Sequence, residues 1–223
     1  MAYEPSEYHP AFEEYTETIY ELAEDGVEVI QARIADRLEV SRAAVSEMVR
    51  RMEREGLVVV DAAHITLTTE GRDIATTVVR RHRLAERFLT DVLGLSWAEA
   101  HHEAGRWEHV ISPTVETALV HLLDDPNTCP HGNPIPGTDY TPPADTMPLV
   151  EAEPQRLFTV QRIPEELEFA AGQLDFLEQS GLMPGRTGTV LSVSPDGVTT
   201  VEMDEGAVGV SSFAAERILV SHT

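Results

Sequence analysis

Histidine and glutamate side chains occur in this chain at spacings that bring them together on helix faces. His82 and Glu86, in the stretch RRHRLAERF, are four residues apart, which is about one helical turn. Glu14 and Glu17 are three residues apart in FEEYTE, near the N-terminus. Imidazole and carboxylate groups of this kind, with no thiolate among them, suit a divalent cation such as Mn²⁺, Fe²⁺ or Zn²⁺.

The stretch HHEAGRWEH, residues 101–109, is the densest cluster. Four of its positions follow one another at helical offsets and share one face: His101, Gly105, Glu108 and His109. His102 and Glu103 fall off that face and are expected in solvent. Histidine–glutamate pairs are also common on exposed helices that bind nothing, so one pair alone does not establish a site. Three such sets in one chain favour a metal centre.

Three further histidines have no partners nearby in the sequence. We interpret His9, His64 and His121 as surface or structural residues, and Cys129 as an inert packed residue or a loop thiol. The chain has no HExxH, no GxSxG, no phosphate-binding loop and no GxGxxG that opens a helix. We therefore predict a binding protein without an organic substrate, and not an enzyme.

Charge is distributed unevenly along the 223 residues. The formal net charge of −23 argues at first against nucleic acid, because phosphates repel a negative surface. All sixteen basic residues are arginines, however, and eleven of them lie between residues 31 and 87, against nine acidic residues. Two interpretations fit this segment: it is a DNA-facing module, or its arginines simply solvate helices. A single cysteine, no apolar N-terminal segment and no long apolar run predict a reduced, cytoplasmic protein without a membrane span.

Apolar spacing in the first seventy residues predicts three helices followed by a hairpin. Helical periodicity runs through residues 10–24, 27–40 and 41–56. Ser41 is a candidate N-cap and Gly56 a candidate C-terminal stop. The runs LVVV and HITLT, separated by DAA, predict a two-stranded wing. A helix pair followed by a wing is the order of a winged helix-turn-helix domain.

The rest of the chain divides into a helical part, a proline-rich part and a β-rich part. The predicted fold is mainly α with β structure. Its predicted parts are a winged helix-turn-helix DNA-binding domain at residues 1–73, a helical dimerisation and metal-binding domain at 74–140, a proline-rich linker at 141–154 and a small SH3-like β-barrel at 155–223.

These stretches resemble the diphtheria-toxin-repressor family of metal-dependent transcription regulators, which has iron-responsive and manganese-responsive members. The resemblance is carried by ARIADRLEVS, VRRMEREGLVVV, RHRLAERFLTDVLGL, HEAGRWEHVIS and HGNPIPG, and it covers most of residues 10–140. It implies a homodimer that binds a palindromic operator in double-stranded DNA and represses metal-uptake genes when metal is bound. Metal would favour the DNA-competent geometry, so metal and DNA would raise each other's affinity by the same factor.

The resemblance also implies two metal sites in each chain. The ancillary site combines helix residues with a residue of the C-terminal domain: His82, Glu86, His101 and Gln173. The family's other ligand from that domain, a glutamate, aligns with Ala170, and Glu168 would replace it after a small shift. The primary site combines the N-terminal helix with the 101–109 stretch: Glu14, Glu17, Gly105, Glu108 and His109.

Two primary-site positions depart from the iron branch, which has a methionine at position 14 and a cysteine at position 105. Glu14 and Gly105 remove both sulfur ligands, and with them the soft component that favours iron over manganese. The manganese branch has carboxylates at positions 14 and 17, but it usually has a glutamate at 105, where glycine offers only its backbone carbonyl. We predict Mn²⁺ as the activating ion and Fe²⁺ as the alternative. Co²⁺, Ni²⁺ or Zn²⁺ are expected to substitute in vitro.

The predicted recognition helix also departs from the family pattern. Candidates for groove contacts are Ser41, Arg42 and Ser46. Glu47 stands where the family has a glutamine, and it would either repel phosphate or accept a hydrogen bond from a cytosine amino group. The candidate phosphate contacts are Arg33, Arg50, Arg51 and Arg54.

Three alternatives to this interpretation remain open. An iron-dependent regulator of the same architecture would differ only in its response to metal. A winged-helix protein controlled by an organic ligand or a partner protein would keep its DNA binding after loss of Glu108 or His109. A metallohydrolase would turn over generic ester or phosphoester substrates.

Overall fold

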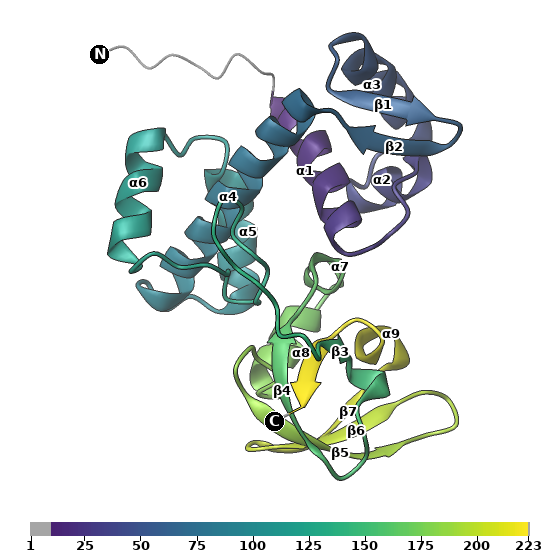
Figure 1. Cartoon of the computed structure of the whole chain (residues 1–223), viewed down its shortest axis with the longest axis vertical. Helices are drawn as coiled ribbons and strands as arrows, with labels where there is room; N and C mark the ends of the chain where they lie inside the picture. Colours follow the sequence, from purple (N-terminus) through teal and green to yellow (C-terminus); the bar gives the residue numbers. More distant parts are fainter. Residues whose placement is uncertain (1–9, 223) are drawn as a thin grey trace.

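Three hydrophobic cores organise the chain, each built mainly from one stretch of sequence. The computed structural model describes residues 10–222, so the start of the predicted first domain, including His9, lies outside the described residues. Figure 1 shows the wing at one end of the long axis, the C-terminal sheet at the other, and helices α4 to α6 between them and to one side. The predicted fold class, helical with β structure at the wing and in the C-terminal domain, is confirmed.

The N-terminal domain consists of three helices and a hairpin: α1 (Pro10–Glu24), α2 (Gln31–Arg37), α3 (Arg42–Arg54), β1 (Val58–Asp61) and β2 (His64–Leu67). Each helix buries one apolar stripe in a common core. Ser41 begins α3 as predicted, because its hydroxyl accepts a hydrogen bond from the backbone N–H of Ala44 at 3.1 Å. Gly56, with φ of +75°, follows α3 and turns the chain into the antiparallel wing.

The middle of the chain consists of three helices: α4 (Thr69–Asp91), α5 (Trp97–Trp107) and α6 (Pro113–Leu122). Helix α4 packs against both α1 and α5. The predicted domain boundary between residues 73 and 74 lies inside α4, so one continuous helix joins the wing domain to the metal-binding helices. Gly71 lets the first turn of α4 lie directly against the backbone before β1, because a Cβ there would lie 2.0 Å from the carbonyl oxygen of Leu57. Among the described residues, no helix is long and apolar enough to cross a membrane.

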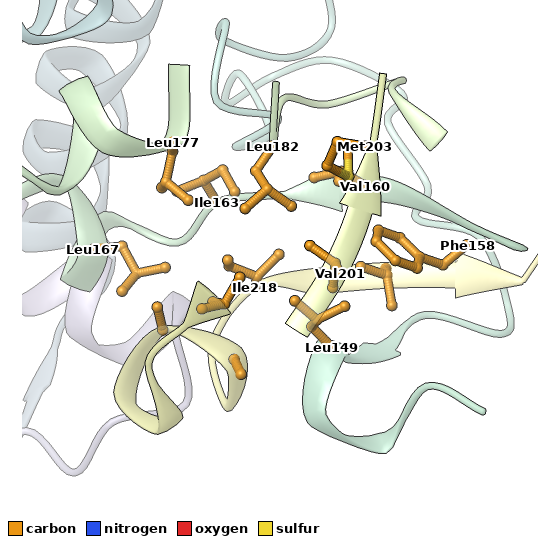
Figure 2. Close-up of a cluster of buried hydrophobic side chains, with 14 of the residues drawn as sticks. Leu149, Phe158, Val160, Ile163, Leu167, Leu177, Leu182, Val201, Met203 and Ile218 are labelled. Atoms are coloured by element: carbon orange, nitrogen blue, oxygen red, sulfur yellow. The ribbon is translucent and has the colours of Figure 1, made fainter. Parts of the chain in front are cut away.

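The C-terminal domain consists of six strands and short helices: β3 (Met147–Pro148), η1 (Leu149–Glu151), β4 (Leu157–Arg162), α7 (Glu165–Glu168), α8 (Gln173–Gln179), β5 (Thr187–Val193), β6 (Thr199–Met203), β7 (Gly206–Val210), α9 (Ser212–Ala215) and β8 (Leu219–His222). The strands form one antiparallel sheet in the order β3–β8–β4–β5–β6–β7. Register shifts in β4 and β5 bend it around the core that Figure 2 shows. The segment predicted as a linker, 141–154, contributes its second half to this domain, because β3 pairs with β8 and Leu149 is fully buried.

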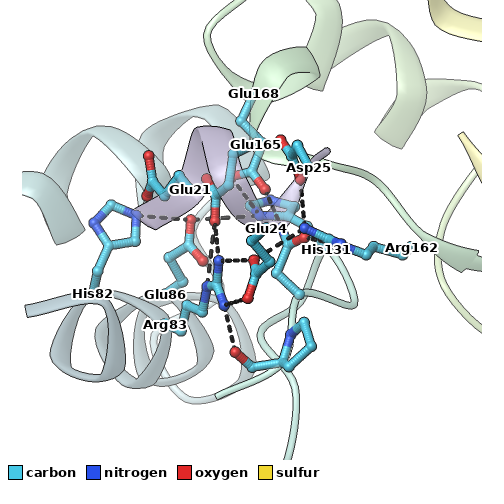
Figure 3. A network of polar contacts seen from close by, with 12 residues as sticks. Glu21, Glu24, Asp25, His82, Arg83, Glu86, His131, Arg162, Glu165 and Glu168 are labelled. Carbon is cyan, nitrogen blue, oxygen red and sulfur yellow. Dashed lines mark hydrogen bonds and ion pairs between the residues drawn. The ribbon is translucent and has the colours of Figure 1, made fainter. Parts of the chain in front are cut away.

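Arginines and carboxylates join the C-terminal domain to the helices, as Figure 3 shows. Arg83 of α4 is fully buried and donates to Glu24 at 2.6 Å and to Glu165 at 3.0 Å. Arg162 of β4 donates to Glu24 at 3.0 Å and to Asp25 at 2.6 Å. The C-terminal end of α1, the middle of α4 and helix α7 therefore meet in one ion-pair network, and the predicted ancillary ligands lie beside it.

Candidate metal centre

The imidazole of His109, just after α5, lies between carboxylates of α1. Its Nδ1 is 2.7 Å from Glu13 Oε2, and its Nε2 is 2.9 Å from Glu14 Oε1. The same Nε2 is 3.2 Å from Glu108 Oε1. Donor atoms of Glu14, Glu108 and His109 lie within 4.8 Å of one another, so small movements would let them converge on one cation. Hydrogen bonds with Glu13 and Glu14 raise the pKa of His109 to about 10, so the ring holds a proton until a cation replaces it.

His82 on α4 connects the two predicted sites. Its Nδ1 is 2.5 Å from Glu108 Oε2, and its Nε2 is 3.2 Å from Glu86 Oε1. Glu17 of α1 completes a second donor set with His82 and Glu108, again within 4.8 Å. Burial acts to lower the pKa of His82, but the carboxylates of Glu86 and Glu108 outweigh it and raise that pKa. The primary and ancillary positions are therefore contiguous, because one imidazole reaches both.

The ancillary residues close against the C-terminal domain. His101 Nδ1 is 3.0 Å from Glu86 Oε1 and 3.1 Å from Glu168 Oε2. Glu168 lies at the end of α7, and its carboxylate reaches His101. It therefore lies where the family's glutamate, which aligns with Ala170, is expected. Burial acts to lower the pKa of His101, but hydrogen bonds with Glu168 and Glu86 outweigh it and raise that pKa to about 10.

These side chains fit a divalent cation. Four buried carboxylate oxygens have no aligned hydrogen bond among the described residues: Glu17 Oε1, Glu86 Oε2, Glu165 Oε2 and Glu168 Oε2. The last of these still lies within ion-pair distance of His101 and His131. Burying such an oxygen without a partner is costly, and a cation would supply the missing charge. Burial, followed by the charge of Glu108, raises the pKa of Glu17 well above its usual value.

Two predicted ligands, Gly105 and Gln173, belong to none of the donor groups described above. Gly105 lines a cavity of about 490 Å³ that Glu14 and Glu108 also line, and a Cβ there would meet nothing within 4 Å. The position therefore faces the primary donors but supplies no side chain. Gln173 begins α8, and it does not line the cavities beside His101. Its Nε2 is buried without a hydrogen-bond partner in the part of the chain that the structure describes, and its role as a ligand stays a prediction.

Four residues near the donors were not predicted as ligands: Glu13, Cys129, His131 and Glu165. Cys129 is packed, as one of its two interpretations held, but it lies beside His131 and Glu86, with donor atoms within 4.8 Å. Burial raises the pKa of the Cys129 thiol to about 11. No periodicity could have revealed Cys129 and His131, because the 124–140 loop is neither helix nor strand. Glu13 was missed because only the packing of α5 on α1 brings His109 to it.

The predicted DNA-contacting residues lie on or near α3. Most are exposed: Arg33, Arg42, Glu47, Arg50, Arg51 and Arg54. Ser46 is half-buried, and the hydroxyl of Ser41 is already engaged in capping α3. The guanidinium carbon of Arg51 lies 4.8 Å from the ring centre of Phe12, so this arginine leans toward α1. Contact of these residues with DNA stays a prediction.

Comparisons with known proteins agree with this arrangement. The family profile "Iron dependent repressor, N-terminal DNA binding domain" matches residues 8–63, and "Iron dependent repressor, metal binding and dimerisation domain" matches residues 68–137. The chain is 44% identical over 200 residues to the iron-dependent repressor IdeR of Mycobacterium tuberculosis, covering 85% of this chain and 87% of that protein. It is 56% identical over 128 residues to the diphtheria toxin repressor of Corynebacterium diphtheriae, covering 57% of each.

Solved structures match nearly the whole chain. A manganese-dependent transcriptional repressor in complex with manganese superposes with a TM-score of 0.82 at 32% identity, covering 95% of this chain and 100% of that one. The manganese regulator SloR superposes with a TM-score of 0.74 at 31% identity, covering 95% and 98%. From these matches, the chain belongs to the iron-dependent repressor family and is a metal-dependent, DNA-binding transcriptional repressor.

Proposed function

We propose that Mn²⁺ activates this repressor and that its targets are genes for metal uptake. The donors gathered around His109 are carboxylate oxygens and imidazole nitrogens. Glu14 and Gly105 stand where sulfur ligands are expected in an iron-responsive member. Oxygen-rich sets suit Mn²⁺, whereas sulfur ligands favour softer ions. This donor set is the observation that carries the proposal.

Fe²⁺ is the second candidate, and the relatives favour it. The relative from M. tuberculosis, 44% identical, is named an iron-dependent repressor, whereas the manganese-dependent repressor structure is 32% identical. Donor chemistry and relatedness therefore point to different ions. Co²⁺, Ni²⁺ or Zn²⁺ should also bind in vitro, since sites of this type follow the usual affinity order of the divalent metals.

Helix α1 is the element through which metal would act. It carries Glu13, Glu14 and Glu17 toward the metal centre, and it buries apolar residues in the same core as α3. His82 and His109 belong to the helical domain instead. A bound cation supplies the positive charge that lets these acidic groups lie together. Holding α1 against α4 and α5 would also hold α3, and so fix its orientation for DNA.

The helical domain offers a surface for pairing with a second copy. Exposed apolar side chains lie at the ends of its helices: Val92, Leu93, Val110, Val115 and Leu122. Val110 is 65% exposed and Leu122 is 60% exposed, and a second copy that covered such apolar side chains would remove them from water. A two-fold dimer would present two α3 helices to the half-sites of a palindromic operator. The cytoplasmic location of the protein stays a prediction.

DNA binding at controlled free metal concentrations tests the proposal. Operator duplexes are first selected from a random library with Co²⁺-loaded protein, because Co²⁺ should occupy the sites under either candidate. Fluorescence anisotropy then compares chelator, Mn²⁺ and anaerobic Fe²⁺. We expect metal to raise DNA affinity by about 5- to 150-fold, with Mn²⁺ acting at lower free concentrations than Fe²⁺. A response to Fe²⁺ at lower concentrations would select the second candidate.

Matched variants separate metal activation from other modes of control. Glu108→Gln should abolish the response to metal, because Glu108 belongs to two donor sets. His102→Ala should leave it intact, since His102 is exposed and hydrogen-bonds to Arg106. DNA binding that ignores every metal, or that Glu108→Gln leaves unchanged, would instead indicate control by an organic ligand or a partner protein.

A further inference from the structure

Phe169, the residue that ends α7, lies outside the core of its own domain. It is 51% exposed, whereas Leu167, two residues earlier, is fully buried in the C-terminal core. Helix α7 lies between the C-terminal sheet and the N-terminal domain, as Figure 1 shows, and it contacts α1. The ring of Phe169 is therefore placed to contact side chains of the other domains.

This ring contacts one residue of each of the other two domains. The guanidinium carbon of Arg37, the last residue of α2, lies over the Phe169 ring, 4.2 Å from its centre. The ring of His101 on α5 meets the Phe169 ring edge-to-face, with centroids 5.2 Å apart and the two planes at 89°. One side chain of the C-terminal domain thus touches both an ancillary donor and the first helix of the helix-turn-helix pair.

The side chain of Arg37 is buried at this contact and only 6% exposed. Its Nη1 lies 3.7 Å from Glu21 Oε2 and donates to the backbone carbonyl of Glu165 at 3.4 Å. Its Nη2 is buried and has no hydrogen-bond partner in the part of the chain that the structure describes. The face of an aromatic ring attracts a cation, most strongly where water is excluded, so Phe169 stabilises the guanidinium here. A side chain so deeply buried serves an internal contact and does not reach a DNA phosphate.

The contact extends the docking of the C-terminal domain from α1 to α2. At α1, Arg162 pairs with Glu24 and Asp25. At α2, Arg37 is the residue held, and α2 packs against α3. Restraint of Arg37 therefore restrains the helix pair that carries the predicted DNA contacts.

We propose that Phe169 is a positioning residue: through Arg37 it lets the docked C-terminal domain hold α2, and so orient α3 for DNA. Glu168 directly precedes Phe169 and reaches His101, so a cation held by these two donors would also fix the neighbouring ring. Metal would favour the docked state and DNA would favour the same state, so each would raise the affinity for the other.

This inference rests on the proposed function in one respect, because it requires a bound divalent cation to raise operator affinity. It does not depend on whether Mn²⁺ or Fe²⁺ is the activating ion. It also differs from the action of metal on α1, since it reaches the recognition helix through the C-terminal domain and α2.

Operator binding by full-length variants tests the role of the ring. Anisotropy gives the ratio of operator affinity at saturating Co²⁺ to operator affinity in chelator. Phe169→Leu keeps an apolar side chain but removes the aromatic face, and it should lower this ratio by about 2- to 30-fold, the range that a cation–π contact supplies. Phe169→Tyr restores the aromatic face and should restore the wild-type ratio. Phe176→Leu, which changes another exposed phenylalanine of the same domain, is the matched control and should keep that ratio.

A double-mutant cycle tests whether the ring acts through Arg37. Arg37→Lys keeps the positive charge beside Glu21 but loses the planar group that stacks on the ring. If Phe169 acts through Arg37, the double variant should lower the ratio no further than the more damaging single change. Losses that simply add would overturn the inference, because Phe169 would then act through His101 alone.

Hydrogen exchange provides a readout that needs no DNA. In the Co²⁺-loaded protein, the backbone amides of α2 (Gln31–Arg37) should exchange about 2- to 30-fold faster in Phe169→Leu than in wild type. They should keep the wild-type rate in Phe169→Tyr and in Phe176→Leu. Circular dichroism checks that every variant is folded.

Two results would overturn the inference. One is a wild-type affinity ratio together with wild-type α2 exchange in folded Phe169→Leu. The other is an equal loss in Phe176→Leu, which would assign the effect to general loosening of the C-terminal domain. Wild-type operator binding that ignores metal would instead refute the proposed function, and the exchange of α2 would still decide whether Phe169 holds that helix. The two failures are therefore distinguishable.

Discussion

Replacing Gly105 with cysteine tests which ion the primary site prefers. Gly105 lies in α5, on the wall of the cavity that Glu14 and Glu108 also line. A Cβ at this position meets nothing within 4 Å, so a thiol can enter without displacing a neighbour. Gly105→Ala fills the same space without adding a ligand and is the matched control.

The structure allows two magnitudes to be worked out for these variants. Glycine inside a helix costs about 1 kcal/mol relative to alanine, so Gly105→Ala should raise the free energy of unfolding of the metal-free protein by about 0.5–1 kcal/mol. Cysteine has a lower helix propensity than alanine and should raise it by less. The added thiolate should shift the ratio of Fe²⁺ to Mn²⁺ affinity by about 10- to 100-fold, the size of effect seen when metal-site residues change. That shift is equivalent to about 1.4–2.8 kcal/mol.

Competition with a fluorescent chelator under anaerobic conditions measures both affinities. The reasoning requires that the affinity ratio change in Gly105→Cys and stay at its wild-type value in Gly105→Ala. Equal ratios in the two variants would mean that position 105 does not reach the ion, and the argument from its missing sulfur would then be wrong. A similar shift in both variants would assign the effect to a stiffer helix.

Three further substitutions test stability, pairing and DNA contact. Arg83→Met leaves the buried carboxylate of Glu165 without its cation and Glu24 with only Arg162, so a denaturant titration should show a free energy of unfolding lower by about 3–5 kcal/mol. Arg106→Met, which removes one exposed ion pair, should cost less than about 1 kcal/mol in the same titration. Leu122→Glu brings like charges to the proposed two-fold interface, so sedimentation should show monomers, and dimers at wild-type strength would exclude this face. Arg50→Ala should reduce the salt dependence of DNA binding by about one phosphate contact per chain, whereas Arg156→Ala, in the C-terminal domain, should not.

Elements governed by local spacing could be predicted from the sequence. His82 and Glu86 lie on one face of α4 as expected, because four residues always span about one turn of a helix. Ser41 caps α3 for an equally local reason, since its hydroxyl reaches a backbone N–H three residues ahead. The replacement of the family's glutamate ligand by Glu168, two residues earlier in the chain, could also be anticipated, because Ala170 at the aligned position has no donor atom in its side chain.

Relations between elements could not be predicted in this way. The sequence by itself determined the helices, the wing, the types of donor and the family. Only the tertiary structure decided that His82 reaches both Glu108 and Glu86, and that Cys129 and His131 enter the same interior. Backbone geometry determines which residues share a face within one element. Which faces meet depends on the packing of α1, α5 and α7 against α4, and on a turn that fits against β4 only because residue 132 is glycine.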